Sequence, residues 1–188
     1  LPEGLGRLAA LEEIDIWGGH GGTSGGFPDS IGRLTTLRRI KTNRYSFPRF
    51  PDALCSLPAL QEIDVDYGSM ESLPEDIGRL GVLTTLKASH NALTRLPDSI
   101  GRCAALEVLD LWHNKLTALP DSIGELSRLR EINLNANSDL HTLPGSFNRL
   151  RSLETMQLST PLWRTAPDFV HPQSVSYTHL TLPTTYTV

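Results

Sequence analysis

Residues 106–126 read LEVLDLWHNKLTALPDSIGEL, and this stretch decides how the chain folds. Leu109 and Leu111 stand two residues apart, so in a strand both point to one face while the residues between them point to the other. The Leu119-Pro120 step ends the extended part, because a residue before proline avoids the helical region and proline suits a first helical position. The stretch therefore predicts one short strand followed by one short helical turn.

The same pattern recurs along the chain. Related blocks begin at Leu11, Leu37, Leu60, Leu83, Leu106, Leu129 and Leu153, at spacings of 26, 23, 23, 23, 23 and 24 residues. A period of this length indicates a repeat architecture, in which each unit buries its apolar face only against its neighbours. We therefore expect seven parallel strands in one sheet, with short helical or 3-10 turns on the opposite side.

The 23-residue unit L-x-x-L-x-L-x-x-N-x-L-x-x-L-P-x-x-I-G-x-L resembles a leucine-rich repeat of the intracellular Leu-Pro type. Such repeats occur in Ras-suppressor and scaffold proteins, plant intracellular repeat proteins and bacterial effectors. The resemblance covers residues 1–170 and implies an α/β solenoid whose concave parallel sheet commonly binds protein. Asn91, Asn114 and Asn137 form the expected asparagine ladder, which other residues interrupt at both ends: Gly19, Tyr45, Gly68 and Pro161.

The repeats also predict the domain organisation. Residues 1–173 are expected to form one repeat domain, and residues 1–10 read as the second half of a repeat. We therefore expect the N-terminus to be a cut through the array and the natural protein to be longer. Residues 174–188 leave the pattern and contain no Asp, Glu, Lys or Arg. We expect an artefactual or disordered tail there, with a terminal strand or β-rich linker as the alternative.

Composition excludes several classes of protein. The 188 residues carry a net charge of −4, which argues against a nucleic-acid partner, and no run approaches the roughly 18 apolar residues of a membrane span. Cys55 and Cys103 stand two repeats apart, about 10 Å or more, and are expected to be reduced thiols. Together with the Leu-Pro repeat type, they favour a cytoplasmic protein, or one in a host cytoplasm. We expect a monomer.

Charged residues follow the same period. Acidic and basic residues four apart near each turn predict ion pairs within the turn: Glu3–Arg7, Asp29–Arg33, Glu75–Arg79 and Asp98–Arg102. If the first leucine of each block is position 1, the signs alternate at position 5 over five successive repeats. This alternation predicts ion pairs between neighbouring strands: Asp15, Lys41, Asp64, Lys87 and Asp110.

Positions 7 and 8 contain the candidate binding residues. His90 and His113 share position 8 on adjacent repeats, about 5 Å apart at the backbone, but the pattern supplies no third ligand for a metal. With Tyr67 and Trp112 they predict an aromatic and polar cluster at the centre of the concave face. Aromatic residues are frequent among interface hot spots. The expected partner-binding residues are Trp112, His113, His90, Tyr67, Asp66, Asp64, Asp110 and Trp17.

The function predicted from the sequence is protein recognition without catalysis, metal or cofactor. Residues 22–26 match G-x-S-x-G, but they lie in a glycine-rich loop and not at the strand-to-helix turn that a nucleophilic serine requires. Two alternatives stay open. The chain is the substrate-targeting segment of a larger enzyme, such as a bacterial effector ubiquitin ligase or a signalling kinase, or it recognises carbohydrate through Trp17 and Trp112.

Overall fold

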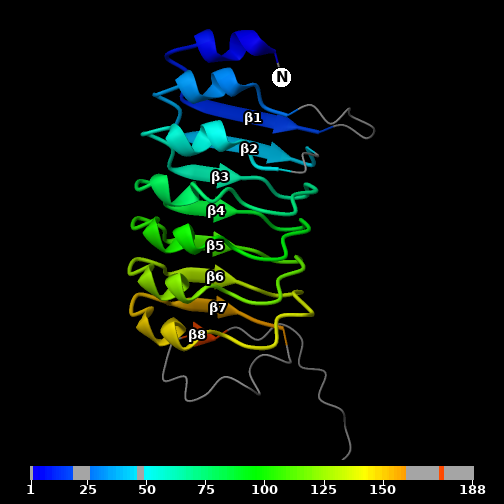
Figure 1. The fold of residues 1–188 in the computed structure, drawn as a ribbon, viewed down its shortest axis with the longest axis vertical. Helices are drawn as coiled ribbons and strands as arrows, with labels where there is room; N and C mark the ends of the chain where they lie inside the picture. Colours follow the sequence, from blue (N-terminus) through cyan, green and yellow to red (C-terminus); the bar gives the residue numbers. More distant parts are fainter. Residues whose placement is uncertain (1, 19–25, 46–48, 160–173, 176–188) are drawn as a thin grey trace, which may run out of the picture.

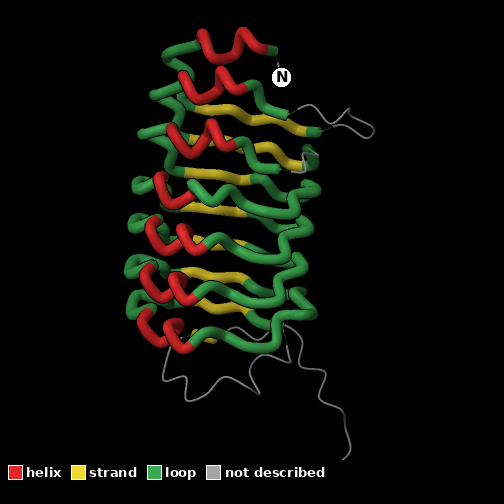
Figure 2. The backbone as a smooth tube through the Cα atoms, viewed as in Figure 1, coloured by secondary structure: helices red, strands yellow, loops and turns green. Residues whose placement is uncertain are grey.

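The computed structural model describes residues 2–18, 26–45, 49–159 and 174–175. Their strands form one parallel sheet in chain order, from β1 to β8, and the 3-10 turns η1 to η7 stack on the other side (Figures 1 and 2). We call the strand side the concave face and the turn side the convex face. The strands are β1 (Glu13–Trp17), β2 (Arg39–Asn43), β3 (Glu62–Asp64), β4 (Thr85–Lys87), β5 (Val108–Asp110), β6 (Glu131–Asn133), β7 (Thr155–Gln157) and β8 (Ser174–Val175). The turns are η1 (Glu3–Arg7), η2 (Asp29–Arg33), η3 (Asp52–Ser56), η4 (Ile77–Arg79), η5 (Asp98–Arg102), η6 (Asp121–Glu125) and η7 (Gly145–Arg149).

The register of the sheet follows the sequence period. Leu109 of β5 pairs with Leu86 of β4 and Ile132 of β6, the residues at the same position of the neighbouring repeats. Leu109 and Leu111 are both fully buried. The predicted parallel solenoid and its inward-facing leucines are therefore confirmed.

One continuous apolar core fills the space between strands and turns, and it includes Thr42 and Ala88, two smaller residues at a position that other repeats fill with leucine. Thr42 and Ala88 are both fully buried. The Thr42 hydroxyl finds no hydrogen-bond partner among the described residues. A buried hydroxyl without a partner is costly, so Thr42 is a weak point of the core.

Each Leu-Pro step leads into a turn, as the sequence predicts. Pro97 precedes η5 with φ −69° and ψ 148°, which is extended backbone, and its carbonyl accepts the first hydrogen bond of the turn from Ile100. The glycine that follows the isoleucine in η4, η5 and η6 lets each of these turns pack closely against the next. A Cβ atom at Gly101 would collide with the carbonyl oxygen of Ser122 in the next turn.

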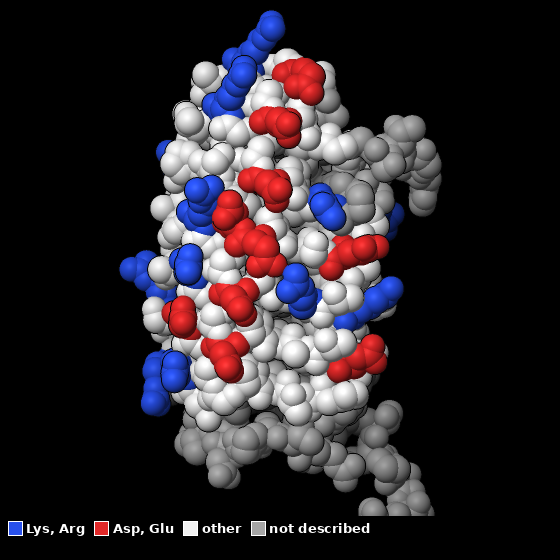
Figure 3. Space-filling model, in the orientation of Figure 1, with Lys and Arg blue, Asp and Glu red and all other residues white. Residues whose placement is uncertain are grey.

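The predicted ion pairs inside the turns are wrong. Arg79 pairs with Asp76, three residues before it (3.2 Å), and Glu75 pairs with Arg95 of the next repeat (3.2 Å). The turns are 3-10 helices, in which residues three apart and not four apart share a face. On the face of the molecule shown in Figure 3, acidic side chains follow one another in a column along the stacked repeats.

Asn91, Asn114 and Asn137 form the predicted ladder. The Asn114 amide nitrogen donates to the carbonyls of Ala88 (2.9 Å) and Leu111 (3.1 Å), and its Oδ1 accepts from the Leu93 N–H (3.0 Å). Asn91 and Asn137 make equivalent bonds. Each asparagine thus satisfies buried backbone groups of its own repeat and of the repeat before it.

The end of the sheet extends beyond the seventh repeat. Ser174 and Val175 form β8, which pairs in parallel with Thr155 and Met156 of β7. These two residues begin the segment for which the sequence left an artefactual or disordered tail and a terminal strand as alternatives. Residues 176–188 lie outside the described part of the chain.

Candidate binding surface

The backbone at position 8 adopts the left-handed conformation in five successive repeats. The φ values lie between 52° and 58°. In the first four of these repeats the position-8 N–H donates to the position-7 carbonyl of the next repeat, as His90 does to Trp112 (2.8 Å), whereas the Ala136 N–H donates to the Ser159 hydroxyl. The sequence gives no signal of this conformation, because none of the five residues is glycine, the usual occupant of this region. The five residues are Arg44, Tyr67, His90, His113 and Ala136.

This repeated conformation brings the side chains at position 8 into a stack. The His90 ring lies between the rings of Tyr67 (centroids 4.2 Å apart, planes 12° apart) and His113 (4.5 Å, 23°). Trp112 approaches His90 edge-on at 4.3 Å. The predicted cluster of Tyr67, His90, Trp112 and His113 is therefore a set of direct ring contacts. We call these four residues the aromatic row.

Arg44 extends the aromatic row at one end. Its guanidinium carbon lies 5.8 Å from the centroid of the Tyr67 ring, within the range of a cation–π contact. The sequence does place Arg44 at position 8 of the repeat before Tyr67, so the stacking order was available from the repeat alignment. At the other end, position 8 is Ala136, and the stack of rings stops at His113.

The aromatic row lies at one edge of the concave face and not at its centre. Strands β3 to β6 end at position 5, so positions 7 and 8 belong to the turns that follow them. Tyr67 and Trp112 are 46% and 39% exposed. Trp17 is 71% exposed at the end of β1, two strands before β3, and makes none of the ring contacts found among the described residues.

Three carboxylates accompany the aromatic row. Asp64 and Asp110 end β3 and β5, and each accepts a hydrogen bond from the N–H two residues later, Asp66 (3.4 Å) and Trp112 (3.0 Å). Asp66 Oδ1 accepts from the Ser89 N–H at 2.6 Å. The pKa of the Asp66 carboxyl is raised to about 6, mainly by burial and also by the charges of Asp64 and Asp110, against the lowering effect of the Ser89 hydrogen bond.

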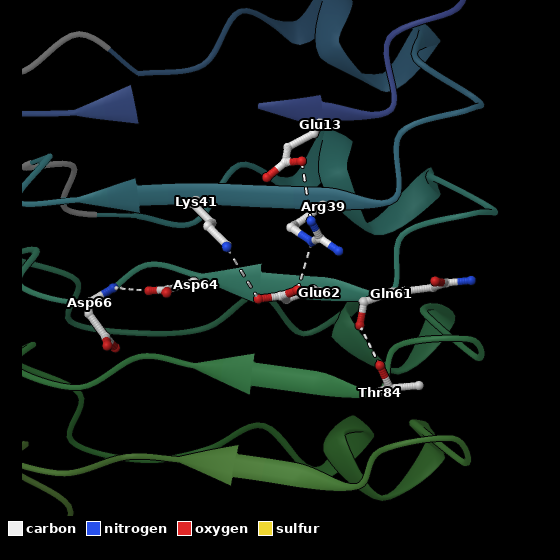
Figure 4. A network of polar contacts seen from close by, with 8 residues as sticks. All are labelled: Glu13, Arg39, Lys41, Gln61, Glu62, Asp64, Asp66 and Thr84. Atoms are coloured by element: carbon white, nitrogen blue, oxygen red, sulfur yellow. Dashed lines mark hydrogen bonds and ion pairs between the residues drawn. The ribbon is translucent and has the colours of Figure 1, made fainter. Parts of the chain in front are cut away.

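The ion pairs predicted along position 5 are wrong as well. Figure 4 shows Lys41 directed to Glu62 (3.9 Å) and not to Asp64. Arg39 lies between Glu13 (3.2 Å) and the same Glu62 (2.8 Å), which are its neighbours at position 3. The register at position 5 is as predicted, but the carboxylates bond to their own turn backbone, where a hydrogen bond requires no long side chain to be ordered.

The surroundings of His90 favour the neutral form of its imidazole. Desolvation is the main cause that lowers the pKa of His90, the charge of His113 adds to it, and Asp110 opposes it. Its Nε2 atom is buried and finds no hydrogen-bond partner among the described residues. In that same part of the chain, no group of three or more His, Cys, Asp or Glu is arranged to hold a metal ion.

The remaining candidates lie elsewhere. Cys55 and Cys103 are free thiols, as predicted. Both are buried, and burial raises their pKa to about 12 and about 11. The G-x-S-x-G match lies outside the described residues, except for Gly26. A hollow of about 680 Å³ at the opposite edge of the sheet contains Arg128 and Arg151, together with Arg130, which is bonded to Glu154 (2.7 Å).

A family model described as a leucine-rich repeat region matches residues 75–172, more than half of the chain. No curated protein sequence matches the chain. Within the described ranges, none of the helices is long and apolar enough to cross a membrane.

Solved structures resemble the fold. A leucine-rich repeat protein of Leptospira interrogans is 26% identical (TM-score 0.69), over 85% of this chain and 47% of that one. The plant peptide hormone receptor RGFR1 in complex with RGF2 is 23% identical (TM-score 0.60), over 85% and 30%. The ectodomain of the Arabidopsis thaliana receptor kinase GASSHO1/SCHENGEN3, in complex with CASPARIAN STRIP INTEGRITY FACTOR 2, is 22% identical (TM-score 0.57), over 85% and 25%. The chain thus spans less than half of each of these proteins.

Proposed function

Because the chain belongs to the leucine-rich repeat family, we propose that it is a non-catalytic recognition module that binds a protein partner on its concave face. The aromatic row is the observation that carries this proposal. It places four large rings in contact on three successive repeats, and two of them, Tyr67 and Trp112, keep about 40% or more of their surface exposed. Rings of this kind contribute much of the binding energy at protein interfaces.

The backbone supports the same proposal. The left-handed turns at Tyr67, His90 and His113 are tied to the next repeat by hydrogen bonds of 2.8–2.9 Å. Their side chains are therefore ordered before a partner arrives, and less conformational entropy is lost on binding. The plant receptors among the similar structures are solved in complex with ligands, which is compatible with a binding role for this fold.

The test is selection of binders from a displayed random-peptide library, followed by measurement of each binder against variants. We expect Trp112→Ala to weaken binding by more than about tenfold, since a hot-spot residue contributes about 1–2 kcal/mol or more. Val82→Ala, which removes another exposed apolar side chain, is the matched control and should bind like the wild type. Binders that do not discriminate Trp112→Ala from Val82→Ala would contradict the proposal and point to the glycine-rich loop or the convex face.

The alternative proposal concerns the whole protein. This chain spans less than half of the solved proteins it resembles. In this alternative, the chain is the targeting segment of a larger enzyme, and its concave face binds the substrate of that enzyme. The full reading frame on both sides of residues 1–188 decides between the two, because it either encodes a catalytic domain or does not.

We further propose a monomer located in the cytoplasm or a host cytoplasm. Two buried thiols in the reduced form support this, since oxidising compartments favour disulfides. Sedimentation of the purified chain, and localisation of a tagged full-length protein, test these two points separately.

A further inference from the structure

We infer that the partner segment bound at the aromatic row carries a lysine or arginine, whose cationic head lies between the carboxylates of Asp66 and Asp110 and against the Trp112 ring. This inference rests on the proposed function and adds the chemistry of what is bound. Charge complementarity and the exposed rings carry it together.

The carboxylates beside the row have no ion pair of their own. None of the ion pairs found among the described residues involves Asp64, Asp66 or Asp110. Lys87 is the single cation on strands β3 to β5; of the neighbouring cations, Lys41 pairs with Glu62, and Arg44 lies over the Tyr67 ring. At position 3, by contrast, Arg39 already pairs with two glutamates. The negative charge beside the row is therefore available to a partner.

The aromatic rings favour a cation that is carried on a lysine or arginine side chain. Arg44 already places its guanidinium over the Tyr67 ring at 5.8 Å, and His90 stacks on the same ring from the next repeat, so a second cation is directed to Trp112. Lysine and arginine have apolar stems that pack on aromatic surface while the charged head reaches polar groups. Trp112 gives the strongest cation–π attraction of the aromatic residues, and its indole is 39% exposed.

The titratable groups around the site predict a pH dependence with one sign. Asp66, whose pKa is raised to about 6, loses its charge as the pH falls. His90, whose pKa is lowered, gains charge only in acid and then repels a bound cation. The other charged or titratable groups beside the row are Asp64, Asp110, His113, Lys41, Lys87 and Arg44. A cationic segment therefore binds more weakly at pH 5 than at pH 7.

The experiment uses three end-blocked heptapeptides, in which glycine alternates with arginine, with glutamate or with glutamine. Alternate side chains of an extended peptide point to the same face, so one peptide presents three identical groups to the sheet. Binding is followed by the Trp112 indole N–H signal in NMR spectra, assigned with Trp112→Phe. We expect the arginine peptide alone to shift this signal, less at pH 5 than at pH 7.

Two variants test the carboxylates. Asp66→Asn and Asp110→Asn keep an oxygen that accepts the Ser89 and Trp112 N–H bonds but remove the charge. Each substitution should weaken the binding of the arginine peptide by about fivefold to tenfold, which is the effect of losing one close charge pair. Asp98→Asn removes the same charge from the convex face and should change the affinity less than about twofold, since charges beyond a Debye length are screened. Thermal melting of each variant verifies that it is folded.

The outcomes separate this inference from the proposed function. If the glutamate or glutamine peptide shifts the Trp112 signal as strongly, the cationic partner is wrong and the binding site at the aromatic row stands. If the arginine peptide leaves the Trp112 signal unchanged, or binds Asp66→Asn and Asp110→Asn as well as wild type, the inference is overturned. The proposed function fails only if peptides selected from the library also bind Trp112→Ala as well as wild type.

Discussion

The His90 ring stacks on the His113 ring at 4.5 Å, although 23 residues separate them in the chain. The two residues share nearly the same backbone conformation, with φ 52° and 53°. Each donates its N–H to the position-7 carbonyl of the next repeat, His90 to Trp112 and His113 to Asn135. The rings are parallel because the backbone that carries them repeats.

Ala136→Gly is expected to stabilise the protein. Ala136 has φ 55°, a conformation that costs an L-residue about 1–2 kcal/mol, whereas glycine loses about 0.5–1 kcal/mol in backbone entropy. The expected gain in the free energy of unfolding is about 0.5–1 kcal/mol, measured by urea denaturation. Ala104→Gly is the control, because its φ is not positive, and it should lose about 0.5–1 kcal/mol. Equal losses for both variants would contradict the prediction.

Asn114→Ala is expected to destabilise the protein by about 1–3 kcal/mol, because it leaves the buried Leu93 N–H without its partner and removes one of the two amide donors of the Ala88 carbonyl. Asn148→Ala removes an exposed asparagine on η7 and should change the free energy of unfolding by less than about 0.5 kcal/mol. Chemical denaturation of both variants measures the difference. A loss at Asn114 as small as that at Asn148 would mean that the ladder does not stabilise the fold.

Thr42→Val is expected to raise the free energy of unfolding by about 1 kcal/mol, since it replaces a buried hydroxyl without a partner by a methyl group. Thr36→Val is the opposite case, because the Thr36 hydroxyl bonds to the carbonyls of Ala9 (2.8 Å) and Leu11 (3.0 Å). Thr36→Val should lower the free energy of unfolding by about 0.5–1.5 kcal/mol. Thermal unfolding of the two variants should therefore shift the midpoint in opposite directions.

Asp66→Asn is expected to change how stability depends on pH. The folded-state pKa of Asp66 is raised to about 6 from 3.8, so between these values the folded state binds more protons than the unfolded state. Stability from this group is therefore greatest below pH 4 and is lost as the pH rises through 6. We expect the variant to be more stable than wild type at pH 7.5 and to lose this advantage at pH 4. A stability difference that is constant over this range would contradict the raised pKa.

Leu109→Ala and Trp112→Ala are expected to separate folding from binding. Leu109 is fully buried, and its truncation should cost about 2–5 kcal/mol of stability through the cavity it leaves. Trp112 is 39% exposed and contacts the His90 ring edge-on, so its truncation should cost about 0.5–1.5 kcal/mol, the value of such a ring pair. Urea denaturation of both variants checks the order. A larger loss at Trp112 would show that the aromatic row is a structural element.

Some of the site was predictable from the sequence and some was not. The neighbours of Trp112 followed from the repeat alignment, because equal positions of adjacent repeats lie side by side. The position of the row at the edge of the concave face did not follow, because β3 to β6 end two residues earlier than an extended L-x-x-L-x-L-x pattern implies. The raised pKa of Asp66 also required the structure, since it depends on burial and on the distances to Asp64 and Asp110.

The sequence by itself determined the period, the parallel register and the buried leucines, because the apolar positions of one repeat are satisfied only by the same positions of the next. Only the tertiary structure decided the partners of Lys41, Arg39 and Arg79. A charged side chain reaches several neighbours on a repeating surface, and its choice depends on whether the turn is a 3-10 or an α helix and on which backbone groups compete. The left-handed turns at His90 and His113 also required the tertiary structure. Hydrogen bonds to the next repeat hold their strained backbone, and the local sequence gives no signal of these bonds.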